Sequence, residues 1–134
     1  MRFTVDRLDH LVLTCRDAEV SASWYQRVLG MEREEFGSER RTALRFGGQK
    51  INIRQASDGG EWATAPGAAP GCMDLCFSTA IASEDIAAHL RNCGVEIVDG
   101  PAPKVGALGP MMSVYCRDPD GNKVEIASYM VDAL

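Results

Sequence analysis

The stretch LDHLVLT at residues 8–14 has a second copy in CMDLCFS at residues 72–78, and this pair decides the fold. Each copy is a strand-like apolar run followed by a helical pattern. An offset of 64 residues carries His10 onto Asp74. Further on, GQKINI at residues 48–53 matches GNKVEI at residues 121–126 at an offset of 73, so the second copy has nine extra residues between its helix and its last strand. A long period with two copies predicts a pair of similar modules rather than a solenoid.

The first module, residues 6–55, is predicted to be a strand, a helix and three more strands. The helix is expected to begin after Asp17, a typical N-cap, and to end at Gly30. Turns that contain glycine separate the later strands. The strands are expected at residues 8–15, 31–36, 40–46 and 50–55.

The second module, residues 72–129, repeats this plan after a linker at residues 56–71 that is rich in Gly, Ala and Pro. Its helix is expected to start with Ser83 as N-cap. The nine-residue insertion falls in residues 99–110, which have three prolines and three glycines and are predicted as a loop. Its strands are expected at residues 72–78, 96–98, 111–116 and 123–127, with a turn at the DPDGN sequence of residues 118–122.

Composition limits the class of protein. A chain of 134 residues is long enough for one domain with its own core. The net charge of −5 argues against a nucleic-acid partner, which needs clustered Lys and Arg. No apolar run approaches the ~20 residues of a membrane span, and the first residues do not resemble a signal peptide. We therefore expect a cytoplasmic protein with no membrane partner.

The five cysteines form no CxxC pair and are expected to be reduced and mostly buried. Cys72 and Cys76 flank Asp74, but strand residues two apart are separated by ~6.6 Å. One ion with bonds of ~2.3 Å to sulfur would not reach all three. His89 is expected on the surface of the second helix.

Two βαβββ modules, LDHLVL near the start and DPDGNKVEI near the end resemble the vicinal oxygen chelate superfamily, which includes glyoxalase I, bleomycin-resistance proteins and extradiol dioxygenases. The resemblance covers residues 6–129. It is strongest to small glyoxalase-domain proteins that are sometimes labelled virulence or dioxygenase-related proteins. It implies an α+β fold in which two tandem modules form a cup-shaped, curved mixed sheet with helices on its outer face.

The resemblance also implies a metal site with one residue from the first and last strand of each module. Those positions are His10, Asn52, Asp74 and Glu125. Asn52 stands where glyoxalase I has a carboxylate, and Asp74 stands where His is commoner. A His and two carboxylates with an open position are typical of a catalytic site for one divalent ion, whether Mn, Fe, Co, Ni or Zn. An amide is a weaker ligand, so Asn52 is placed with the substrate-binding residues.

The function implied is that of a metal-dependent lyase or isomerase on a small molecule with adjacent oxygen atoms. Glu125 would act as general base, while Arg54 and Lys104 join Asn52 in binding the substrate. Without a metal, His10 would bond a carboxylate and Glu125 would pair with Arg45 or Arg54. The rival function is therefore a metal-free protein that binds an antibiotic or metabolite. A dioxygenase is less favoured, because that chemistry usually needs two His. A homodimer is expected, since one pair of modules leaves strand edges open.

Overall fold

The structure of the chain is a computed structural model that describes residues 1–58 and 64–130. The chain divides into two compact units, Met1–Ala69 and Pro70–Leu134, which are called unit 1 and unit 2. Part of the predicted linker, residues 59–63, lies outside the described residues.

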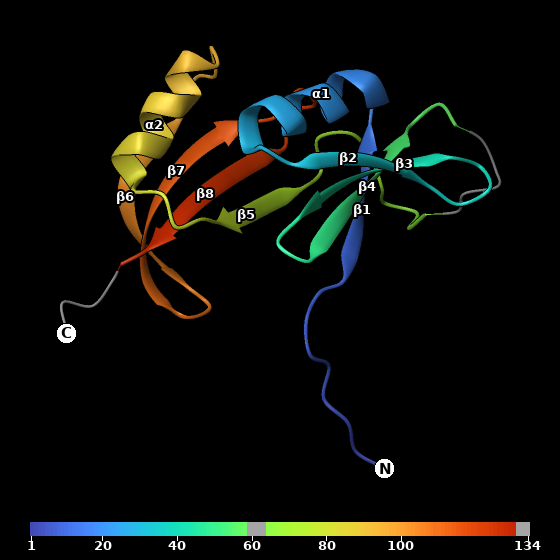
Figure 1. Cartoon of the computed structure of the whole chain (residues 1–134), viewed down its shortest axis with the longest axis horizontal. Coiled ribbons are helices and arrows are strands. Elements are labelled where there is room, and N and C mark those ends of the chain that lie inside the picture. Colours follow the sequence, from blue (N-terminus) through green and yellow to red (C-terminus); the bar gives the residue numbers. More distant parts are fainter. Residues whose placement is uncertain (59–63, 131–134) are drawn as a thin grey trace. The chain divides into compact units, whose positions relative to one another are not determined.

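Unit 1 is a four-stranded sheet with one helix (Figure 1). Its elements are β1 (His10–Cys15), α1 (Ala18–Leu29), β2 (Glu32–Phe36), β3 (Arg41–Phe46) and β4 (Gln49–Gln55). The strand order is β1-β4-β3-β2. β1 runs parallel to β4, and the other neighbours are antiparallel.

Unit 2 repeats this topology. Its elements are β5 (Asp74–Ser78), α2 (Ser83–Asn92), β6 (Asp99–Gly106), β7 (Gly109–Arg117) and β8 (Lys123–Tyr129). The strand order is β5-β8-β7-β6, with β5 parallel to β8. The predicted α+β fold of two βαβββ modules is thereby confirmed. In the part of the chain that the structure describes, neither helix is long and apolar enough to cross a membrane.

The helix ends follow the predicted signals in unit 1 and depart from them in unit 2. The Asp17 carboxylate accepts hydrogen bonds from the amides of Glu19 and Val20, and Gly30 ends α1 in the left-handed region at φ 66°. In α2 the N-cap is Ala82, which provides no side-chain hydrogen bond. Ser83 is the first helical residue, so its prediction as N-cap was wrong by one position.

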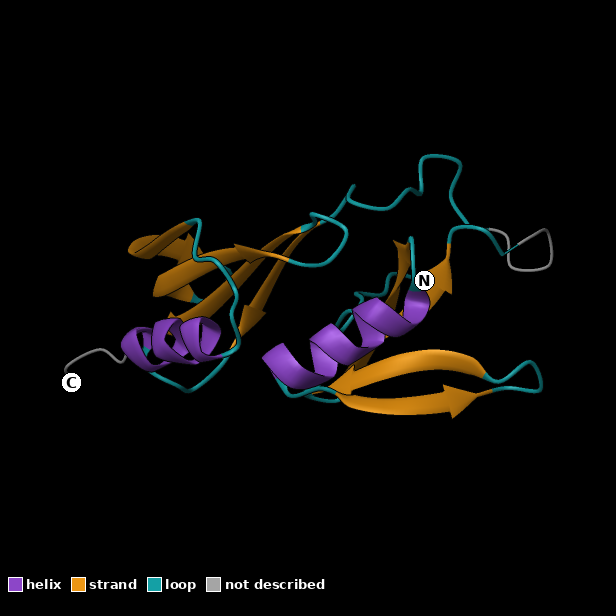
Figure 2. Ribbon diagram, turned by 90° about the horizontal axis from the view of Figure 1, so that it is seen from above, coloured by secondary structure: helices purple, strands orange, loops and turns teal. Residues whose placement is uncertain are grey.

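In each unit the helix packs against one face of the sheet, and apolar residues fill the space between them (Figure 2). Because side chains alternate along a strand, every second residue points to the helix and the others point away. The face turned away from the helix is therefore free to hold polar groups. The buried residues of this core include Leu13, Leu44, Ile51, Tyr25 and Val28 in unit 1, and Val114, Val124, Ile126, Ile86 and Leu90 in unit 2.

The insertion in unit 2 is a β-hairpin, so the prediction of a loop at residues 99–110 was wrong, as was the strand at 96–98. β6 pairs with β7, placing Ala102 opposite Ser113 and Lys104 opposite Met111. Prolines usually argue against a strand, since they lack the amide proton. β6 is the edge strand of its sheet, where a missing amide proton on the outer side breaks no ladder hydrogen bond.

The predicted DPDGN turn is present between β7 and β8, and its hydrogen bonds to Met73 link the start of β8 to the start of β5. The Asp118 carboxylate accepts hydrogen bonds from the amides of Asp120 and Asn122 and from the Asn122 side chain. Asn122 is fully buried, and its side-chain oxygen accepts from the amide of Met73 at 2.8 Å. The amide of Lys123 in turn donates to the Met73 carbonyl at 3.1 Å. Asp74 directly follows Met73, and Glu125 lies two residues after Lys123. The turn therefore fixes the positions of Asp74 and Glu125 relative to each other.

Candidate functional site

Two of the predicted site residues, His10 and Asn52, lie on one face of unit 1. Lys50 is opposite His10 and Asn52 is opposite Val12, so both residues are on the face turned away from α1. They are diagonal neighbours on adjacent strands, within reach of each other for long side chains. That spacing lets two side chains reach one ligand.

Asp74 and Glu125 have the same relation in unit 2. Asp74 is opposite Lys123, while Glu125 lies between Cys76 on β5 and Tyr115 on β7. Asp74 is exposed and Glu125 is half-buried. The structure therefore brings the two predicted ligands of each module onto one sheet face.

Buried oxygen atoms without hydrogen-bond partners lie on these same two faces. They are Thr14 Oγ1 and Asn52 Oδ1 in unit 1, and Ser113 Oγ and Glu125 Oε2 in unit 2. A buried polar atom left unpaired costs about 1–3 kcal/mol, so proteins seldom keep one without a reason. Asn52 and Glu125 occupy equivalent positions in the repeat. A cation, a water molecule or a ligand hydroxyl on each face would supply the missing partner.

The surroundings of Glu125 are rich in protonated neighbours. Burial and hydrogen bonding to the Glu125 carboxylate raise the pKa of Tyr115 to about 12. Partial desolvation of the thiol, together with the charge of Glu125, raises the pKa of Cys76 to about 11, although the residue is exposed at the surface. Both groups are therefore protonated at neutral pH and face an acceptor that keeps Oε2 open. The ammonium groups of Lys104 and Lys123 lie 5.5 and 4.8 Å from the centre of the Tyr115 ring.

His10 is held by its neighbour in the chain. Its Nδ1 lies 2.8 Å from Asp9 Oδ1, and its side chain is 47% exposed. The hydrogen bond from His10 is the main reason why the pKa of the Asp9 carboxyl is below its ordinary value. His10 thus bonds a carboxylate through Nδ1, and this carboxylate is the exposed one of Asp9 rather than the carboxylate inside the cup that the metal-free alternative requires.

The two arginines considered as partners of Glu125 are engaged elsewhere. Arg45 Nε pairs with Glu34 at 2.5 Å, and Arg54 donates to the carbonyl of Asp58 at 3.1 Å. Arg54 nevertheless lies opposite Thr14, on the face that carries Asn52. It remains close to the predicted site as a residue of the same face.

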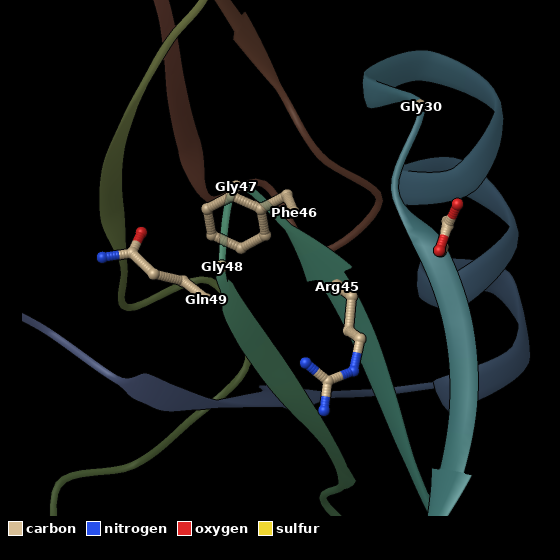
Figure 3. A pocket seen from close by; sticks show the side chains of 7 residues that line it. Gly30, Arg45, Phe46, Gly47, Gly48 and Gln49 are labelled. Atoms are coloured by element: carbon tan, nitrogen blue, oxygen red, sulfur yellow. The ribbon is translucent and has the colours of Figure 1, made fainter.

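A pocket of about 420 Å³ lies at the end of this face in unit 1 (Figure 3). Arg45 is opposite Lys50, so the pocket borders the row of residues that contains His10. None of the predicted site residues lines it. The Gln49 side chain donates to the Leu8 carbonyl at 2.7 Å and fixes the chain that leads into His10. The residues around the pocket are Gly30, Glu32, Arg45, Phe46, Gly47, Gly48 and Gln49.

The donor set fits a divalent cation in part. An imidazole and two carboxylates are good ligands, and the unpaired Glu125 Oε2 is an acceptor in need of a positive partner. Within residues 1–58 and 64–130, however, no three His, Cys, Asp or Glu side chains are grouped so as to hold an ion. Each unit by itself provides two of the four equivalent positions, His10 and Asn52 in unit 1 and Asp74 and Glu125 in unit 2.

The other predicted residues have simpler surroundings. All five cysteines are free, but only Cys15 and Cys116 are buried, so the expectation that most are buried was wrong. His89 is exposed on α2, as predicted, with its Nε2 3.6 Å from Cys93 Sγ.

Sequence reasoning missed Tyr115, Lys123 and Asp9, and it considered Cys76 only as a metal ligand. Lys123 lies two residues from Glu125 on the same strand, so alternation alone would have placed it on the same face. Tyr115 shares alternation with Met111 along β7. Its place beside Glu125 depends on the register between β7 and β8, which cannot be inferred from the sequence.

Comparisons with known proteins match this architecture. The model of the family described as Glyoxalase/Bleomycin resistance protein/Dioxygenase superfamily matches residues 7–126. Virulence protein STM3117 of Salmonella typhimurium is 42% identical over 133 residues, covering 97% of this chain and 89% of that protein. Glyoxalase domain-containing protein RDO1 of Mycosarcoma maydis is 43% identical, covering 96% and 71%. Integron cassette protein VCH_CASS1 of V. cholerae has a solved structure with a TM-score of 0.92 at 41% identity, covering 97% and 100%.

More distant structures share the fold alone. Lactoylglutathione lyase from Agrobacterium tumefaciens has a TM-score of 0.71 at 18% identity, covering 93% of this chain and 95% of that one. TnmS3, an antibiotic binding protein from Streptomyces, has a TM-score of 0.75 at 17% identity, covering 96% and 100%. One fold thus serves both a lyase and a binding protein.

Proposed function

Since the chain belongs to the glyoxalase/bleomycin resistance protein/dioxygenase superfamily, we propose that it is a metal-dependent enzyme of the lyase or isomerase type. Its substrate is a small molecule with adjacent oxygen atoms. The observation that carries this proposal is the pair of buried, unpartnered acceptors, Asn52 Oδ1 and Glu125 Oε2, at equivalent positions of the two units. Such acceptors suit a site whose ligands arrive from outside the chain.

His10, Asp74 and Glu125 are the proposed ligands of one divalent ion: Mn, Fe, Co, Ni or Zn. The modules that share the ion belong to one chain or to two chains of a homodimer. Bound at this site, the ion would supply Lewis-acid stabilisation of a developing oxyanion. Asn52 is excluded from the ligands, because a neutral amide oxygen holds such ions weakly.

The chain's own residues have distinct proposed roles. Glu125 serves as general base, since its buried Oε2 has no hydrogen-bond partner among the described residues and can accept a substrate proton. Tyr115 and Cys76 hold the carboxylate from the two neighbouring strands. Asn52 accepts a hydrogen bond from a substrate hydroxyl.

Cations near these groups are proposed to select the substrate. Lys104 and Lys123 approach the ring of Tyr115 from β6 and β8, and Arg54 lies on the polar face of unit 1. Together they favour a substrate with an anionic group near its paired oxygens.

The test is metal content and melting temperature of His10→Ala, Asp74→Ala, Glu125→Ala and Asn52→Ala, each with and without chelator. We expect the first three to lose the metal and Asn52→Ala to keep most of it. In His10→Ala and Asp74→Ala the half-buried Glu125 carboxylate also loses its counter-charge, so stability and metal content should fall together. A wild-type protein that carries no metal, and whose melting ignores chelator, would overturn the proposal.

The second candidate is a metal-free binding protein. Asn52 favours it, because this neutral amide, flanked by Val12 and Ala43, can hydrogen-bond a small molecule without a metal ion. The same metal analysis separates the two functions. Binding of a small molecule that is unaffected by chelator would support the binding protein.

We also propose a homodimer. β1 and β5 are edge strands of their own sheets, and edges of this kind are commonly covered by another chain. Light scattering at micromolar concentration should give twice the monomer mass. A monomeric mass together with full metal occupancy would exclude a site shared between chains.

A further inference from the structure

The carboxylate of Asp9 determines which nitrogen of His10 is available. Asp9 Oδ1 lies 2.8 Å from His10 Nδ1. An ionised carboxylate can only accept a hydrogen bond, so Nδ1 of the neutral ring must carry the proton. Nε2 then holds the free electron pair.

Comparison of the two units shows that the fold does not require a carboxylate at the position of Asp9. Met73 takes the position of Asp9 in unit 2, directly before Asp74. The backbones of the two residues do the same work, because the Asp9 carbonyl accepts from the amide of Lys50 and the Met73 carbonyl accepts from the amide of Lys123. A thioether therefore satisfies this position in the fold. A carboxylate is found in the unit whose candidate ligand is a histidine, the residue with two possible tautomers.

The other charged groups near Asp9 do not replace His10 as its partner. Lys50 and Arg45 act on the Asp9 carboxylate through their charge. The Lys50 ammonium lies 3.5 Å from the centre of the Phe36 ring, and Arg45 is paired with Glu34. The close hydrogen bond of Asp9 is the one to His10.

We propose that Asp9 is a positioning residue that fixes the His10 tautomer and directs Nε2 to the metal ion. This inference rests on the proposed function, in which His10 is a ligand. Carboxylates that orient a ligating histidine in this way commonly add about 10- to 100-fold to metal affinity.

The first experiment measures the tautomer without any metal. The chain has two histidines, His10 and His89, so long-range ¹⁵N NMR of the full chain gives two ring patterns. The spectra of wild type and variant are recorded at the same mildly alkaline pH. Wild type should show His10 protonated on Nδ1. Asp9→Met, which copies unit 2, should move protons to Nε2 and leave His89 unchanged.

The second experiment titrates chelator-treated protein with Zn²⁺ or Co²⁺. Asp9→Met should bind the ion about 10- to 100-fold more weakly than wild type. Asp6→Met is the matched control, because it removes the same charge from the same segment, where Asp6 pairs with Arg7. It should bind within about twofold of wild type. Asp9→Asn retains a neutral acceptor for Nδ1 and should restore part of the affinity.

The outcomes are separable. An unchanged His10 tautomer in Asp9→Met would overturn the inference, and so would equal loss of affinity in Asp9→Met and Asp6→Met. A wild-type protein without affinity for either ion would overturn the proposed function. The NMR comparison would then still decide whether Asp9 controls His10.

Discussion

Units 1 and 2 share a strand order and register, but they surround equivalent polar positions differently. Asn52 has the apolar neighbours Val12 and Ala43, whereas Glu125 has Cys76 and Tyr115. The turn before the last strand differs as well. It is a glycine pair in unit 1 and the hydrogen-bonded DPDGN turn in unit 2.

The difference shows what a duplicated module must keep and what it can change. The strand order, the parallel pairing of the first and last strands and the apolar face toward the helix are the same in both units. The pairing of β6 with β7 contains a register shift, whereas that of β2 with β3 is regular. On the face away from the helix, Lys50 and Lys123 are equivalent, but Asn52 corresponds to Glu125. Within the described residues, it is unit 2 that combines a carboxylate with hydrogen-bond donors on both sides. We infer that unit 2 provides the reactive group of the proposed site, and that unit 1 provides orientation.

The largest expected effect concerns the two turns. Asn122→Ala leaves the Met73 amide without its side-chain acceptor and removes the side-chain donor to Asp118 Oδ2 in a buried place, so it should lower the free energy of unfolding by roughly 2–4 kcal/mol. Gln49→Ala is the equivalent change in unit 1. It removes a single hydrogen bond, to the Leu8 carbonyl, which is more exposed to solvent, and should cost less than about 1 kcal/mol. Chemical denaturation measures both. Equal losses of unfolding free energy would show that the two turns stabilise the fold to the same extent.

The next comparison exchanges charge between the equivalent acceptors. Asn52→Asp places a carboxylate among apolar neighbours, so the metal-free protein should lose roughly 1–3 kcal/mol of stability. Its affinity for a divalent ion should rise at least about tenfold, since ligand charge strengthens such sites. Glu125→Gln should do the opposite, abolishing metal uptake without lowering metal-free stability. Scanning calorimetry with and without added Mn²⁺ measures both the stability and the affinity for the ion. Weaker Mn²⁺ binding by Asn52→Asp than by wild type would contradict the proposal that the unit 1 face borders the metal site.

A smaller effect is expected in alkaline solution. The pKa of Tyr115 is raised to about 12 in the fold from an ordinary value near 10.0. Between these pH values the unfolded chain loses the proton and the folded chain keeps it, so stability is complete below pH 10 and falls as pH rises toward 12. The melting temperature of wild type should therefore decline more steeply above pH 10 than that of Tyr115→Phe. Tyr129→Phe, the control in the same unit, should follow the wild-type slope.

The smallest effect separates the three lysines of the chain, each of which lies over an aromatic ring. Contacts of this kind contribute about 0.5–1 kcal/mol at exposed sites, so Lys50→Met, Lys104→Met and Lys123→Met should all melt close to wild type. Affinity for acidic substrates should fall in the two variants of unit 2 and persist in Lys50→Met. Metal content should not change in any of them. Unchanged substrate affinity in both unit 2 variants would remove these lysines from the site.

The repeat made much of the fold predictable, because one offset relates equivalent strands. The alternation of His10 and Val12, and of Asp74 and Cys76, was enough to assign faces. The edge strand β6 was not predictable in this way, since Pro101 and Pro103 imitate a loop until the strand's place at the edge is known.

The candidate site was predictable to the level of which residues share a face within one module. Its hydrogen bonds were not, because they depend on register between strands distant in the chain. Tyr115 lies opposite Glu125 only after β7 has paired with β8. Asp9 was overlooked for another reason: a carboxylate next to a histidine in sequence gives no sign of which ring nitrogen it will contact.

The prolines of β6 also have a consequence for how the protein avoids aggregation. Pro103 lies in the regularly paired part of β6, opposite Met112, and lacks the amide proton that a further strand would need for pairing. Pro101 lies where the register with β7 shifts between Asp99 and Ala102. Prolines and irregular pairing both hinder the addition of a strand at an edge, so β5 is the edge of this sheet that is better suited to extension by another chain.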